Sequence, residues 1–208
     1  MNTIKRILAV TVVTPLFCAS LRAEACRDQS CVSFDTGLAL QQPVTIRDTL
    51  GGTSAKAEFA PGLRFDLAAE YPLDEFWSIG LETGIIFNPV NSLGGVPISS
   101  LGGSLDFYEF PLLFDVTYRL PPQGYFQAYV SAGVGGVATW FYQDQFNYSS
   151  DLTLGYQVAI GTNYELGKNW ELGLAYKLLG TTRRDFGNGF EADGNLTHSF
   201  LATLTCKF

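Results

Sequence analysis

Few residues in this sequence could take part in catalysis, and the single histidine limits most of the possible arrangements. His198 is followed by Ser199, and Glu109 or Glu191 could orient the imidazole if the fold brought them together. A serine hydrogen-bonded to a histidine would form a nucleophile with its general base. Neighbouring residues on a strand point to opposite faces, however, so His198 and Ser199 cannot form that pair by themselves. We therefore assign no catalytic residues and expect that the chain is not an enzyme.

The cysteines indicate disulfide chemistry rather than a metal site, because no other ligands stand near them at a suitable spacing. Cys26 and Cys31 are the local candidate pair in an exported chain. Cys31 and Cys206 are an alternative pair, since a closed barrel would bring the ends of its first and last strands together. The acidic residues expected in loops also lack the spacing of a 12-residue calcium loop; they are Asp144, Asp151, Asp185, Glu191 and Asp193. We expect neither a metal nor a cofactor.

The beginning of the chain has the composition of an export signal. Lys5 and Arg6 precede an apolar run over residues 7–17, and Ala23 and Ala25 supply the small residues of a cleavage site. The run is too short to span a bilayer as a helix. We assign residues 1–25 to a signal peptide for Sec-type export and residues 26–208 to one mature domain. The net charge of -7, without a basic stripe, argues against nucleic acid as a partner.

Most of the remaining sequence alternates apolar with polar residues, which is typical of strands that have one apolar face. Eight such segments are expected, over residues 33–40, 63–71, 77–88, 112–119, 126–135, 152–161, 170–178 and 199–208. Short turns alternate with four long connections, over residues 41–57, 89–104, 143–151 and 180–195. This pattern predicts an all-β fold, an eight-stranded antiparallel up-and-down transmembrane β-barrel, with its short turns in the periplasm.

The two faces of these strands indicate which side meets lipid. Aromatic residues collect near the strand ends on the apolar face, as in the girdles of membrane barrels; they include Tyr71, Trp77, Phe87, Tyr118, Phe126, Trp140, Tyr142, Tyr164, Trp170 and Phe208. The polar face combines many glycines with charges of both signs. We expect these charges to form a paired network inside the barrel; they are Asp35, Arg64, Asp66, Glu70, Glu82, Asp115, Arg119, Glu171 and Lys177, with Lys207. A soluble periplasmic lipocalin-like barrel that binds a hydrophobic ligand is the alternative.

Two motifs carry a family resemblance. The segment YEFPLLF at residues 108–114 and the segment SAGVGG at residues 131–136 resemble the small OmpA/OmpX-type outer-membrane β-barrel domain, over about residues 32–208. The resemblance implies a location in the bacterial outer membrane and insertion by the barrel assembly machinery. In this family that machinery reads the last strand and its terminal aromatic residue, here Phe208. Cys206 departs from the pattern because it occupies an aromatic position.

The expected role follows from the size of the barrel and from its loops. An eight-stranded barrel is about wide enough for its own side chains, so a diffusion pore is disfavoured. We expect a non-enzymatic protein with a structural or surface-interaction role through four extracellular loops, in contact with outer-membrane lipid and lipopolysaccharide, and with a surface protein ligand as a further partner of unknown identity. A lipid-modifying enzyme is the alternative, but lipid A deacylases use a His-x-Ser arrangement and residue 200 is Phe. The loop charges Arg183, Arg184 and Asp185 are interpreted as a solvated group rather than a phosphate site.

Overall fold

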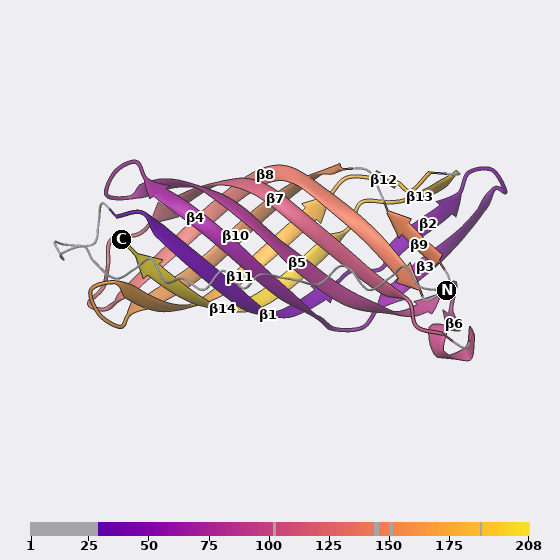
Figure 1. Cartoon of the computed structure of the whole chain (residues 1–208), viewed down its shortest axis with the longest axis horizontal. Helices are drawn as coiled ribbons and strands as arrows, with labels where there is room; N and C mark the ends of the chain where they lie inside the picture. The colour runs from indigo at the N-terminus through magenta and orange to yellow at the C-terminus, as the bar shows by residue number, and fades with distance from the viewer. Residues whose placement is uncertain (1–28, 102, 144–145, 150–151, 188) are drawn as a thin grey trace, which may run out of the picture.

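Eight long strands close into a barrel in the computed structural model, which describes residues 29–101, 103–143, 146–149, 152–187 and 189–208 (Figure 1). All of their pairings are antiparallel, and β1 pairs with both β4 and β14, which closes the barrel. The predicted eight-stranded barrel is therefore confirmed. Its strands are β1 (Cys31–Gln41), β4 (Gly62–Pro72), β5 (Trp77–Leu93), β7 (Asp106–Arg119), β8 (Phe126–Gln143), β10 (Thr153–Glu165), β11 (Trp170–Thr181) and β14 (Leu196–Lys207).

The long connections differ from the expectation, because they fold into further strands rather than irregular loops. They contain β2 (Val44–Asp48), β3 (Thr53–Phe59), β6 (Val96–Pro97), β9 (Phe146–Ser149), β12 (Arg184–Asp185) and β13 (Phe190–Ala192), with a 3-10 helix, η1 (Ile98–Leu101). Strands β12, β13, β2, β3 and the end of β5 pair in that order, and we call this group the loop sheet. It continues the barrel wall at one end (Figure 1).

The loop sheet is ordered because it packs on an apolar core that it shares with η1 and with the barrel strands β7 and β8. Sequence reasoning missed it, since the abundant Gly, Asn and Ser residues of these segments indicate turns. Five buried residues form this core, which we call the mouth cluster: Ala57, Val90, Ile98, Phe107 and Phe141. The aromatic rings of Phe107 and Phe141 lie 4.7 Å apart between their centroids.

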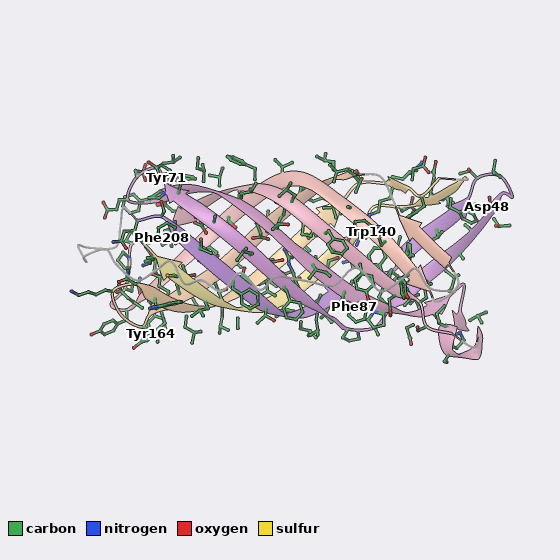
Figure 2. The ribbon with its side chains drawn as sticks, viewed as in Figure 1. Asp48, Tyr71, Phe87, Trp140, Tyr164 and Phe208 are labelled. Atoms are coloured by element: carbon green, nitrogen blue, oxygen red, sulfur yellow. The ribbon has the colours of Figure 1, made fainter. Side chains whose placement is uncertain are left out.

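The strands present an apolar face outward and a polar face inward. Along β7, the side chains of Leu112, Phe114 and Val116 are exposed, whereas those of Leu113 and Asp115 between them are buried. Figure 2 shows labelled aromatic side chains near both ends of the wall, with Tyr71, Tyr164 and Phe208 at the short-turn end; Phe87 and Trp140 lie toward the loop sheet, and Asp48 marks its tip. This arrangement suits a lipid environment and is the inverse of a soluble calyx.

Pro111 interrupts the ladder between β5 and β7. The pairing of these strands skips residues 84 and 85, opposite Pro111, which has no N–H to donate. The hydroxyl of Thr83 donates to the carbonyl of Pro111 at 3.0 Å and supplies part of the missing hydrogen bonding. Among the described residues, no helix is long and apolar enough to cross a bilayer.

Candidate functional site

The centre of the barrel interior is held by Lys177. Its ammonium nitrogen contacts Asp35 Oδ2 at 2.7 Å, Asp66 Oδ2 at 2.9 Å and Glu82 Oε2 at 2.6 Å. The side chains reach one another because Asp35 lies opposite Asp66 in the pairing of β1 with β4. Three carboxylates around one ammonium would repel one another without it, so Lys177 is the residue on which this arrangement depends.

Arg64 extends the same cluster across the barrel. Its Nε lies 2.7 Å from Asp66 Oδ2, its Nη2 lies 3.0 Å from Glu82 Oε1, and Nη2 also donates to Gln157 Oε1 at 2.6 Å. Arg64 and Asp66 are two residues apart on β4, so their side chains share one face of the strand. Both are buried, so this face is the inward one. The guanidinium of Arg64 is fully buried, and its charge is met by two carboxylates.

Two further ion pairs lie toward the short-turn end. Arg119 Nη2 contacts Glu70 Oε2 at 2.5 Å, and Lys207 pairs with Glu171. The structure thus brings nine of the ten charged residues expected inside the barrel into ion pairs. The exception is Asp115, which is buried and has no hydrogen-bond partner among the described residues.

An apolar layer separates this network from the loop side. It consists of five fully buried side chains from five strands: Ala39, Ile86, Leu113, Val137 and Leu179. Ile86 is an apolar residue on the inward face of β5, which is otherwise mostly polar, and its place in this layer explains the exception. The layer places apolar side chains from five of the eight barrel strands together in the interior.

Above the apolar layer, β12 inserts Arg184 into the barrel mouth. Its Nη2 donates to Glu109 Oε1 at 2.6 Å and to Thr181 Oγ1 at 2.5 Å, and also to Asn195 Oδ1. The guanidinium lies 5.4 Å from the ring centroid of Phe107 in the mouth cluster. We call Arg184 with Glu109, Thr181 and Asn195 the loop anchor, because it ties the loop sheet to the barrel wall.

The loop anchor corrects the expectation for the charges at residues 183–185. Arg183 is solvated, with its side chain 62% exposed, and it pairs with Glu191 at 3.4 Å. Arg184, however, is buried, and this burial lowers the pKa of its guanidinium while the Glu109 carboxylate offsets part of that shift. The sequence carries no separate signal for Arg184, because only the pairing of β12 with β13 places it inward.

The structure does not bring the candidate catalytic residues together. His198 Nδ1 lies 2.7 Å from the hydroxyl of Tyr176, and its Nε2 lies 3.1 Å from Gln42 Nε2. Ser199 is buried, and its Oγ lies 3.4 Å from Arg64 Nη1. Glu109 belongs to the loop anchor and Glu191 pairs with Arg183, so neither carboxylate orients the imidazole of His198.

The acidic loop residues are used within the loop sheet rather than gathered at one point. Asp193 forms two hydrogen bonds with Arg47, at 2.6 and 2.8 Å, and Asp185 accepts a hydrogen bond from the backbone of Gly187 at 2.7 Å. Asp144 and Asp151 lie outside the described residues.

The predicted disulfide pairs are wrong, since both require Cys31, which is a free and buried thiol. Cys206 is disulfide-bonded. Cys31 lines the interior, whereas Cys206 alternates with the outward residues Ala202 and Leu204, so the two side chains lie on opposite faces of the wall although their strands pair. Cys26, like the predicted signal peptide over residues 1–25, lies outside the described residues.

The interior leaves little open space among the described residues. A cavity of about 40 Å³ lies among the charged residues, and a second of about 30 Å³ lies at the short-turn end. Cavities of this size hold only a few water molecules. These two cavities can therefore hold small ions or water.

Comparisons with known proteins agree with this architecture. The model of a family described as "Outer membrane protein beta-barrel domain" matches residues 11–208. Neisserial surface protein A is similar in structure with a TM-score of 0.59 and 15% identity, over 86% of this chain and 97% of that chain. OprG from Pseudomonas aeruginosa is similar with a TM-score of 0.56 and 16% identity, over 88% and 97% of the two chains.

An outer-membrane protease is also among the similar structures. OmpT from Escherichia coli has a TM-score of 0.54 and 11% identity, over 92% of this chain and all of that chain. At these identities the similarity establishes the fold and not an activity. No curated protein sequence matches the chain.

Proposed function

The chain belongs to the outer membrane protein beta-barrel domain family, and from this membership we propose that it is a non-enzymatic, closed barrel that displays its loop sheet as an interaction surface. It is located in the bacterial outer membrane, among the lipids and lipopolysaccharide of that membrane. The loop sheet would then face the cell exterior and the short turns the periplasm, as in other barrels of this class.

The observation that carries this proposal is the contrast between the filled interior and the ordered loops. The ion pairs of Lys177 and Arg64, the apolar layer and the loop anchor fill successive levels of the barrel. The connections meanwhile form a sheet held by the mouth cluster and by a buried arginine. Rigid scaffolds that hold loops in place commonly carry binding surfaces.

A non-enzymatic role is supported by the positions of His198 and Ser199. They lie on opposite faces of β14, and each has a neighbour that gives it a structural role, Tyr176 for His198 and Arg64 for Ser199. A nucleophile and base would need direct contact or one bridging water.

Phe208 supports a role for the barrel assembly machinery in insertion. Its side chain is exposed on the outer surface at the short-turn end, and its backbone N–H donates to Ser30 at 2.9 Å (Figure 2). We propose that this terminal aromatic residue is the part of the last strand that the machinery reads.

A closed interior predicts no transport of small solutes. We expect liposomes that contain the refolded protein to swell in arabinose at the rate of protein-free liposomes, because the interior of an eight-stranded barrel is about filled by its own side chains. Light scattering after mixing with the sugar measures the rate, and a general porin serves as the positive control. Swelling well above the protein-free rate would show that the barrel conducts and would contradict the proposal.

Display of the loop sheet at the cell surface predicts that two exposed lysines differ in chemical labelling of intact cells. Lys56 lies in β3 of the loop sheet, and Lys168 lies in the turn between β10 and β11. We expect a membrane-impermeant amine reagent to modify Lys56 in intact cells and Lys168 only after the outer membrane is broken, as peptide mass spectrometry would show. Lys56→Arg is the control for labelling at that site. Labelling of Lys168 alone in intact cells would reverse the orientation of the barrel.

A further inference from the structure

Four residues that line the 40 Å³ cavity have side-chain oxygens without a hydrogen-bond partner among the described residues. These oxygens are both carboxylate atoms of Asp115, Oδ1 of Asp35, Oδ1 of Asn163 and Oγ1 of Thr203. Each of the four residues is more than nine-tenths buried. Unpaired acceptors at such depth are rare in proteins and costly, so their grouping around one cavity points to a ligand that all of them can bind.

The strand pairing explains why three of these residues line the same cavity. Asp35 lies opposite Thr203, Thr203 lies opposite Gly173, and Gly173 lies opposite Asn163, so these residues form one row across four neighbouring strands. Gly173 leaves space between Thr203 and Asn163, because a Cβ there would lie 2.3 Å from Asn163 Oδ1.

A second glycine makes room for the remaining carboxylate. Asp115 lies opposite Gly133 in the pairing of β7 with β8. A Cβ at Gly133 would lie 2.0 Å from Asp115 Oδ1, so the carboxylate of Asp115 can occupy its place only because residue 133 is a glycine.

The charges in this half of the interior do not balance. The carboxylates outnumber the bases by two; the carboxylates are Asp35, Asp66, Glu70, Glu82, Asp115 and Glu171, and the bases are Arg64, Arg119, Lys177 and Lys207. Each base is already paired, and the position among Asp35, Asp66 and Glu82 where a metal could bind is filled by the ammonium of Lys177. One unmatched charge therefore lies on Asp115, and the other lies within the group of Asp35, Asp66 and Glu82, whose three carboxylates face the two bases Arg64 and Lys177.

We propose that the cavity binds one divalent hard cation of the Ca²⁺ type, with Asp115 as its main ligand. Asp35, Asn163 and Thr203 would supply further oxygens, and water would complete the shell, since Ca²⁺ takes about six to eight oxygen ligands. A cavity of about 40 Å³ has room for one ion with its remaining water. A divalent ion also supplies the two positive charges that the neighbouring bases lack, which water alone cannot do.

The cation would reach the cavity from the short-turn end. The second cavity, of about 30 Å³, lies there and shares Cys31 and Arg119 with the first as lining residues. The apolar layer lies on the other side of the ion pairs, so the short-turn end is the more open route to the cavity. The site would thus equilibrate with the periplasm and not with the medium outside the cell.

Calcium binding to the refolded full-length barrel tests the proposal. The protein is refolded in detergent without lipopolysaccharide, stripped with EDTA and dialysed against ⁴⁵Ca²⁺. We expect one bound Ca²⁺ per chain, an affinity at least tenfold weaker in Asp115→Asn, and an unchanged affinity in Glu58→Gln, which removes the same charge from the exposed loop sheet. Absence of saturable binding of either Ca²⁺ or Mg²⁺ would overturn the proposal, as would wild-type affinity in Asp115→Asn.

Thermal unfolding separates ligation from a merely structural role of Asp115. The temperature at which the folded form disappears on a heat-modifiability gel should rise with Ca²⁺ in the wild type and stay constant in Asp115→Asn. In EDTA the order should reverse, with Asp115→Asn the more stable protein, because the variant no longer buries an unpaired carboxylate. Thr203→Val removes one neutral oxygen and decides the question if Asp115→Asn does not fold. It should weaken binding several-fold, and an unchanged affinity would then overturn the proposal.

Discussion

Lys177→Met is expected to lower the free energy of unfolding by about 3–5 kcal/mol, the usual cost of removing one partner from a buried ion pair. The methionine side chain nearly preserves volume, so the loss would be electrostatic rather than a packing defect. Asp35, Asp66 and Glu82 would all lose the ammonium that lies within 2.9 Å of each of them. Urea unfolding of the protein in lipid vesicles, followed by tryptophan fluorescence, measures the change.

Two further variants show whether the loss arises from the buried charges. Lys56→Met removes an exposed lysine from the loop sheet and should change the unfolding free energy by less than about 1 kcal/mol. Adding Glu82→Gln to Lys177→Met should recover part of the lost stability, because one of the three repelling carboxylates becomes neutral. A double variant less stable than Lys177→Met would contradict this account of the cluster.

Arg184→Met is expected to release the loop sheet while leaving the barrel folded. Removing the guanidinium leaves Glu109 buried without its ion-pair partner and breaks the contacts of Arg184 with Thr181 and Asn195. A cost of about 3–5 kcal/mol would increase the open population of the loop sheet roughly 100-fold or more. Cleavage by proteinase K at limiting protease, read by mass spectrometry, measures this population.

The neighbouring arginine provides a matched control. Arg183→Met removes the same charge one residue earlier, from a side chain that is 62% exposed and paired only at the surface, so its cleavage rate should stay close to that of the wild type. Both variants should keep the heat-modifiable behaviour of a folded barrel. Equal protection of the two variants would show that Arg184 does not hold the loop sheet.

The barrel wall was predictable from the sequence because each of its strands must alternate between lipid and interior. Strand β7 illustrates this: Leu112 and Phe114 could face only lipid, whereas Asp115 and Thr117 could face only the interior. The prediction placed this strand at residues 112–119, whereas the observed strand begins at Asp106. Pro111 interrupts the hydrogen-bond ladder without ending the strand.

The loop sheet and the loop anchor were not predictable in the same way. Strand β12 has two residues, which is too short for a period of two to appear. Arg183 and Arg184 are chemically identical, and only the pairing of Arg184 with Ala192 decides which of them turns inward. The disulfide prediction failed for a related reason. That two strands pair does not show on which face of the wall each thiol lies until the register is known.

The apolar layer also divides the molecule into two parts. Its five side chains lie between the ion pairs around Lys177 and the pair of Glu109 with Arg184; they are Ala39, Ile86, Leu113, Val137 and Leu179. Substitutions in the loop sheet would therefore leave the direct contacts of the ion pairs around Lys177 unchanged. The layer thus separates two tasks in one barrel: side chains on one side of it hold the loop sheet, and side chains on the other side neutralise the charges inside the wall.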